Sequence, residues 1–142
     1  NDAEIRGAFT GLGTETTRDD MTRAVLEGVS FGLKDSAEAL RATGADLPHL
    51  FAIGGGTRSR SWLRLLATVL DLPLHLPAEG EFGAALGAAR LGRMVATGEA
   101  PEVVLTPPAT AEVVDPVAAL VPAYAEAYAR FRAAYPGLRA VQ

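Results

Sequence analysis

The strongest chemical signal in this sequence of 142 residues is a run of three glycines. The stretch "FAIGGGTRSRSW", residues 51–62, places the run between an apolar segment and a predicted helix. Backbone N–H groups at a helix N-terminus favour anions, and glycines let a ligand approach without a Cβ in the way. Thr57 and Ser59 add hydroxyls, and Arg58 and Arg60 add cationic donors. This turn is therefore a candidate site for a phosphate or a flat base.

The glycine run also has a plain structural explanation. Its spacing matches neither the G-x-x-x-x-G-K-[ST] phosphate loop nor the G-x-G-x-x-G dinucleotide motif. Glycines between a strand and a helix are often only a tight turn. From this segment alone, both the ligand loop and the plain turn stay open.

The composition excludes several classes of function. A net charge of -4 and a pI near 5.1 leave no basic footprint for nucleic acid, and no apolar run is long enough for a membrane span. The sequence has no cysteine, which rules out disulfides and is compatible with the cytoplasm. Two isolated histidines, His49 and His75, do not make a metal site. We expect a protein of the cytoplasm that binds neither nucleic acid nor membranes.

The hydrophobic pattern predicts an α/β chain. Expected helices cover 17–43, the residues after a cap at Ser59 or Ser61, 80–97 and 117–135, and expected strands cover 47–53 and 74–76. Helix and strand alternation implies a parallel pair joined by a right-handed crossover. We expect an N-terminal segment over 1–16, an α/β core over 17–98, a proline-rich surface linker over 99–116 and a C-terminal helix over 117–135.

Two helices carry glycines four residues apart, at Gly28 and Gly32 and at Gly83 and Gly87. Each glycine inside a helix costs about 1 kcal/mol relative to alanine, which a close approach of another backbone or of a ligand would offset. Close helix packing is the favoured interpretation.

Four segments together resemble one family. They are "RGAFTGL" (6–12), "RAVLEGVSFGLKD" (23–35), "IGGGTRSRSW" (53–62) and "GAALGAARLG" (83–92), in this order and spacing. This pattern is similar to the C-terminal domain of the FGGY carbohydrate kinases, and among them most to the xylulokinase branch. The resemblance runs from Arg6 to Leu138 and includes the aromatic tail.

The resemblance implies an actin-like, ribonuclease H-type fold that closes over a sugar and ATP–Mg²⁺. It implies that the glycine turn lines the nucleotide site, which makes Gly55, Gly56, Thr57, Ser59 and Arg60 the candidate nucleotide-binding residues. Glycerol kinases have an asparagine where this sequence has Arg60, so Arg60 could stack on adenine or point to solvent. The resemblance offers no metal ligand here.

The family's general base, an aspartate, belongs to an N-terminal domain that nothing here resembles, so no catalytic residue is expected in this chain. We expect a partial C-terminal domain, inactive alone, whose bare sheet edge and apolar face favour a homodimer. The alternatives are another sugar kinase of the family, acting on gluconate, ribulose, fuculose or glycerol, or a non-catalytic interaction module.

Overall fold

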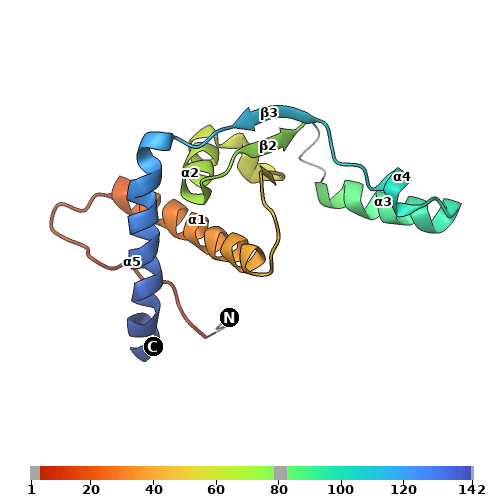
Figure 1. The fold of residues 1–142 in the computed structure, drawn as a ribbon. Coiled ribbons are helices and arrows are strands. Elements are labelled where there is room, and N and C mark those ends of the chain that lie inside the picture. Colours follow the sequence, from red (N-terminus) through yellow and green to blue (C-terminus); the bar gives the residue numbers. More distant parts are fainter. Residues whose placement is uncertain (1–3, 79–82, 142) are drawn as a thin grey trace.

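The computed structural model describes residues 4–78 and 83–141, and its elements follow one another along the chain as in Figure 1. The helices are α1 (Arg18–Ala42), α2 (Arg60–Leu70), α3 (Gly83–Thr97), α4 (Pro101–Val104) and α5 (Val121–Ala140), and the strands are β1 (Leu50–Phe51), β2 (Leu74–Pro77) and β3 (Thr110–Val114). Two 3₁₀ turns, η1 (Gly55–Arg58) and η3 (Ala118–Leu120), precede α2 and α5.

The predicted parallel pair is confirmed, but the sheet is mixed. β1 pairs in parallel with β2, with Leu50 opposite Leu74, and β3 adds to the other edge of β2 in the antiparallel direction. The prediction of a surface linker over 99–116 is wrong, because this range contains α4 and β3. The alternating, β-branched end of "TAEVV" is the signal for β3, and the prolines before it obscured that signal.

Local sequence explains where the first two long helices begin. Thr17 and Asp20 form a capping box, in which the Thr17 side chain accepts the Asp20 N–H at 3.2 Å and Asp20 accepts the Thr17 N–H at 2.9 Å. The hydrogen bonds from Thr17 hold the pKa of the Asp20 carboxyl below its usual value. Ser59, one of the two caps expected, accepts the Trp62 N–H at the start of α2.

The last helix was expected over 117–135, but α5 continues through Pro136 and ends at Ala140. Proline removes only its own N–H bond and the following residues still donate within the helix, so one further turn forms. The third helix was expected from residue 80; α3 is seen from Gly83, and the start of that prediction lies outside the described residues.

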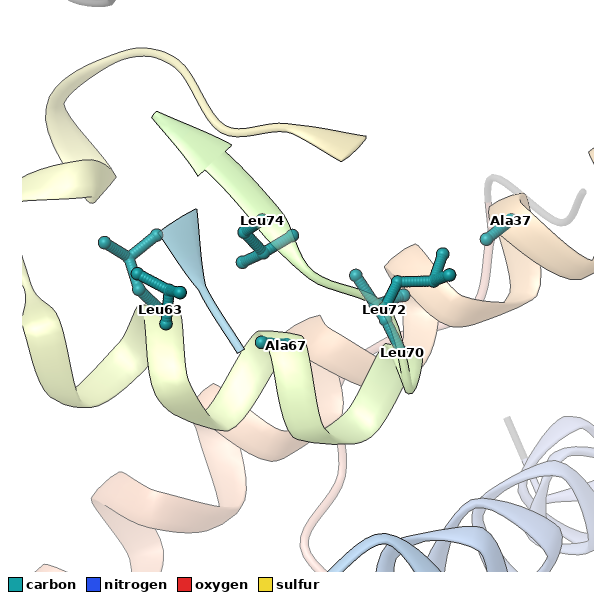
Figure 2. Packing of buried hydrophobic residues seen from close by; sticks show 7 residues of the cluster. Ala37, Leu63, Ala67, Leu70, Leu72 and Leu74 are labelled. Carbon is teal, nitrogen blue, oxygen red and sulfur yellow. The ribbon is translucent and has the colours of Figure 1, made fainter. Parts of the chain in front are cut away.

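The main core lies between α2 and the sheet, as Figure 2 shows. Its buried residues are Ala37, Leu63, Ala67, Leu70, Leu72, Leu74 and Val114. α1 packs along α2, so α2 is covered on one side by the sheet and on another by α1.

A second core joins α1, α2 and α5. Phe31 is buried on α1, and three rings of α5 lie around it at centroid distances of 5.3 to 6.5 Å. Those rings belong to Tyr124, Tyr128 and Phe131, of which Tyr124 is buried and Phe131 is still 40% exposed. Val69 of α2, fully buried, completes this cluster.

By contrast, α3 and α4 project from the far end of the β2–β3 ribbon (Figure 1). None of the described residues of α3 is buried, and Val95 is 88% exposed. In the described parts of the chain, no helix has the length and apolar character needed to cross a membrane.

We expect Leu63→Ala to lower the free energy of unfolding by about 2–5 kcal/mol, because the cavity left in the main core cannot be refilled. Leu63 is only 2% exposed. The matched control is Leu91→Ala on α3, where the side chain is 58% exposed and the change should stay within about 0.5 kcal/mol. Urea denaturation followed by circular dichroism measures both, and equal losses would contradict this core assignment.

We also expect stability to fall between about pH 10 and 12. Burial, followed by the hydrogen bond to Asp35, raises the pKa of Tyr128 to about 12 from an ordinary 10.0. The folded state therefore keeps a proton that the unfolded chain loses, so this contribution is complete below pH 10 and disappears as pH rises through 12. Over this pH range, Tyr128→Phe should lose about 1–2 kcal/mol less of its free energy of unfolding than the unaltered chain loses. This figure allows for the partly exposed ring.

The control for this pH dependence is Phe131→Leu, which changes the same aromatic cluster without a titrating group. It should keep the wild-type slope of stability against pH. Some slope should survive in Tyr128→Phe, because burial raises the pKa of Tyr124 as well. An unchanged slope in Tyr128→Phe would show that Tyr128 is not responsible.

Candidate functional site

The glycine turn lies where the parallel pair ends. β1 stops at Phe51, residues 52–54 leave the sheet, η1 follows, and α2 begins at Arg60. The turn is thus beyond the carboxyl end of a parallel strand and directly before a helix N-terminus, which is where α/β folds gather ligands. The five candidate residues are contiguous there: Gly55, Gly56 and Thr57 lie in η1, Ser59 caps α2, and Arg60 is its first residue.

The three glycines of the run are bare for three different reasons. Gly54 has φ 89° and ψ -178°, a backbone conformation that only glycine adopts at low cost. At Gly56, a Cβ would lie 2.3 Å from Cζ3 of Trp62, so the indole ring already occupies that space. At Gly55, a Cβ would meet no described atom within 4 Å. Gly54 and Gly55 therefore both leave open space that a ligand could approach, and at Gly55 no left-handed backbone angle explains the glycine.

The hydroxyls of the turn are used to hold its shape. Thr57 donates its hydroxyl and its backbone N–H to the Gly54 carbonyl, at 2.8 and 3.1 Å. Ser59 donates its N–H to the Gly56 carbonyl at 3.1 Å, and its side chain caps α2. As arranged here, Thr57 and Ser59 shape the turn, and the groups left to meet a ligand are chiefly backbone.

Arg60 is engaged by a partner that sequence reasoning missed. Its guanidinium forms an ion pair with Glu112 of β3, a residue of the range expected to be a linker. Both side chains are about half exposed, at 59% and 43%, so the pair is worth at most about 1 kcal/mol. The pair ties the start of α2 to the outer strand, and no local sequence signal joins two residues 52 positions apart.

The glycine pairs on the helices behave differently from one another. A Cβ at Gly83 would come within 2.5 Å of the Ile53 side chain, which lies between β1 and η1, so the space there is filled by a side chain and not by the expected helix. At Gly28, Gly32 and Gly87 nothing described lies within 4 Å. Close packing at these three positions stays a prediction.

A separate open cavity of about 580 Å³ lies among α1, α2 and α5. Its lining consists of Asp19, Thr22, Arg23, Leu26, Ser61, Arg64, Leu65, Thr68, Val117, Leu120 and Tyr124. The α2 members repeat every three or four residues on the side of the helix away from the sheet core. None of the five candidate residues lines it, so this cavity and the glycine turn are different places.

One wall of the cavity is a polar cluster that links α1 to α5. Arg23 donates to Glu27 at 2.8 Å and to the Tyr124 hydroxyl at 2.6 Å, and that hydroxyl donates to Glu27 at 3.0 Å. The hydrogen bond with Glu27 raises the pKa of the Arg23 guanidinium above its usual value. Arg23 and Glu27 thus pair one turn apart on α1, and through Tyr124 the cluster holds α5 in place.

The structure brings together the two histidines that the sequence separates. The His49 and His75 rings stack with centroids 4.1 Å apart, and Phe51 packs edge-on against both. Among residues 4–78 and 83–141, no three His, Cys, Asp or Glu side chains gather in a way that could hold a metal ion. The described residues therefore fit a ligand approached through backbone at Gly55, but they do not fit a protein-bound metal.

Known proteins that resemble this chain are several times longer than it is. A solved structure described as a "xyloylose kinase" from Brucella ovis matches with a TM-score of 0.88 and 51% identity, covering 100% of this chain and 29% of that one. Xylulose kinase of Escherichia coli is 36% identical over 107 residues, or 75% of this chain and 22% of that protein. Glycerol kinase of Myxococcus xanthus is 42% identical over 90 residues, or 63% and 18%.

The chain therefore spans about a fifth of the length of the curated relatives that it matches. Residues 1–96 match the model of the FGGY family of carbohydrate kinases, C-terminal domain. That range contains α1, the glycine turn, α2 and most of α3. With an actin-like architecture shared by its structural neighbours and two thirds of its length within the family model, this chain belongs to the FGGY family of carbohydrate kinases and matches its C-terminal domain.

Proposed function

We propose that this chain is the nucleotide-binding part of an ATP-dependent carbohydrate kinase that converts D-xylulose to D-xylulose 5-phosphate. The observation that carries the proposal is the open backbone at Gly55, beyond the end of β1 and at the entrance to α2. The 36% identity of this chain to the xylulose kinase of Escherichia coli supports the choice of sugar. We also propose that the kinase works in the cytoplasm, where ATP is supplied.

In this proposal the residues of the turn share the work. Gly55 lets the nucleotide lie against the backbone, while Gly56, Thr57 and Ser59 keep the turn in shape. The ion pair with Glu112 holds the Arg60 side chain beside the turn, and its guanidinium is the cationic group that this residue brings to the site. ATP, when bound, supplies the γ-phosphoryl group, and the part of the chain that is described offers no metal-ligating cluster, so Mg²⁺ would arrive on the nucleotide phosphates.

The chain by itself would bind nucleotide but not transfer phosphate. Phosphoryl transfer depends on positioning and electrostatics across a closed site, with a base that orients the acceptor hydroxyl. The turn contains hydroxyls, glycines and arginines but no carboxylate. The base and most of the sugar contacts would come from an N-terminal domain of the kind that the longer relatives contain.

A second candidate function keeps the reaction and changes the sugar. The glycerol kinase of Myxococcus xanthus is 42% identical over 90 residues, so the nucleotide half alone does not separate sugars strongly. The discriminating measurement is sugar-dependent ATP turnover by a full-length kinase containing this sequence, tested with D-xylulose, glycerol and gluconate. Turnover with D-xylulose alone would support our choice, and preference for another sugar would replace it.

We expect the unaltered chain to bind ADP–Mg²⁺ in isothermal titration and Gly55→Val to weaken that binding by at least about tenfold. A Cβ at Gly55 meets no described atom within 4 Å, so the substitution should leave the fold intact while the branched side chain fills the space proposed for the nucleotide. Circular dichroism and thermal melting check that the fold is kept.

The matched control is Gly92→Ala on α3, a glycine that also has open space around it but lies away from the turn. It should bind ADP–Mg²⁺ as the unaltered chain does. Gly55→Val binding ADP–Mg²⁺ normally would remove the nucleotide from this turn. No binding by the unaltered chain, together with a stable oligomer, would favour the non-catalytic interaction module.

We further propose that the chain, expressed by itself, pairs with a second copy. Its accessible surface is 9698 Å², whereas a folded monomer of 14.8 kDa exposes about 7,000 Å². The excess is larger than the roughly 800 Å² that each partner buries in an interface of standard size. The excess includes an apolar stripe on α1, formed by Met21, Val25, Val29, Leu33 and Leu40, each 36% to 52% exposed.

The α1 stripe has a shape suited to self-pairing. Val25, Val29 and Leu33 form a ridge at four-residue spacing, and Gly28 and Gly32 leave a groove beside it. Ridges of this spacing pack into the grooves of a second helix, and a two-fold axis lets one face serve both copies.

Light scattering coupled to gel filtration at micromolar concentration should therefore give a dimer, with a mass near twice 14.8 kDa. Val29→Asp should shift the chain to the monomer, because the carboxylate would be buried without a partner. Val95→Asp is the control, since Val95 is 88% exposed on α3, away from the α1 stripe. A monomeric unaltered chain would contradict the dimer, and a dimer untouched by Val29→Asp would move the interface elsewhere.

A further inference from the structure

Trp62 is the one tryptophan in the sequence, and the structure places its ring beneath the glycine turn. A Cβ built on Gly56 would lie 2.3, 3.1 and 3.3 Å from three carbons of the six-membered ring. A real Cβ essentially never lies within 3.0 Å of such an atom, so the indole fills the place of a side chain at Gly56. Gly56 is bare because of Trp62, and a ligand is not needed to explain it.

Trp62 is also tied to the turn through its backbone. Its N–H donates to the Ser59 side chain at 3.4 Å, and the Ser59 N–H donates to the Gly56 carbonyl at 3.1 Å. Two hydrogen bonds thus connect Gly56 to Ser59 and Ser59 to Trp62, and the indole ring packs back against Gly56. Together these contacts fix the angle at which β1 passes into α2.

The indole keeps this position at a cost. Its Nε1 atom is buried and has no hydrogen-bond partner among the residues that the structure describes. An unpaired buried donor is unfavourable, and tryptophan usually places this group against an acceptor. Packing of the ring beneath the turn therefore outweighs an unsatisfied N–H, as expected for a ring whose position matters.

We propose that Trp62 is the positioning residue of the nucleotide site: its ring supports Gly56 and holds the turn so that Gly55 faces the ligand. This inference rests on the proposed function for the identity of the ligand, but the Trp62–Gly56 contact does not depend on any ligand. Residues on the same helix that pack into the core, such as Leu66, support the fold without supporting the turn.

The contact is tested by a double-mutant cycle without nucleotide. Gly56→Ala should lower Tm by about 5 °C or more and shift the Trp62 emission to the red, because the new Cβ expels the ring. In the Trp62→Leu background the same Gly56→Ala change should move Tm by less than about 2 °C. An equal loss in both backgrounds would overturn the inference, whatever the nucleotide experiments give.

Positioning is tested by titration with ADP–Mg²⁺ on the full 142-residue chain. Trp62→Leu should weaken ADP–Mg²⁺ binding at least about tenfold, whereas Leu66→Ala, with a comparable loss of Tm, should stay within about twofold. Equal effects of the two variants, or normal binding by Trp62→Leu, would overturn the positioning role. Failure of the unaltered chain to bind ADP–Mg²⁺ would overturn the proposed function together with that role, while the cycle still decides the contact.

Discussion

Burial of α2 between two different surfaces holds this chain together. Ala67 and Val69 have no exposed surface and Leu63 has 2%, although the helix is only 11 residues long. The sheet core packs on one side of it and the Phe31 cluster on another. Thr68 adds a polar tie, since its hydroxyl accepts the Val117 N–H at 3.0 Å and so anchors the approach to α5. Because α2 begins at the glycine turn, the same packing that stabilises the chain also fixes the candidate site.

The turn is consequently a rigid connection and not a flexible loop. Hydrogen bonds within it involve Thr57 and Ser59, and the ring of Trp62 supports it. Preorganised backbone is what a nucleotide site needs, because a loop that must be ordered on binding loses affinity. What is left for recognition is small: the open backbone at Gly54 and Gly55, the first turn of a helix and a guanidinium held by Glu112.

Much of the molecule's apolar surface has no partner within the described chain. The α1 stripe, Gly32 and most of the projecting α3 are exposed, in a chain that covers about a fifth of its curated relatives' length. Exposed apolar surface of this extent is typical of an interface. α2 thus packs into both cores of the chain, whereas α3 and one face of α1 stay exposed.

Local sequence determined the helices with strong caps and the position of the glycine turn, because capping and hydrophobic periodicity act over a few residues. Thr17 and Asp20, Ser59, and the order of helices and strands were all predictable in this way. Tertiary structure alone decided which of the three glycines has a side chain packed against it. Gly54, Gly55 and Gly56 are identical as letters, and only the backbone angles and the Trp62 ring distinguish them. The pairing of β3 with β2 and of Arg60 with Glu112 also came from folding, since contacts between distant residues leave no local pattern in a single sequence.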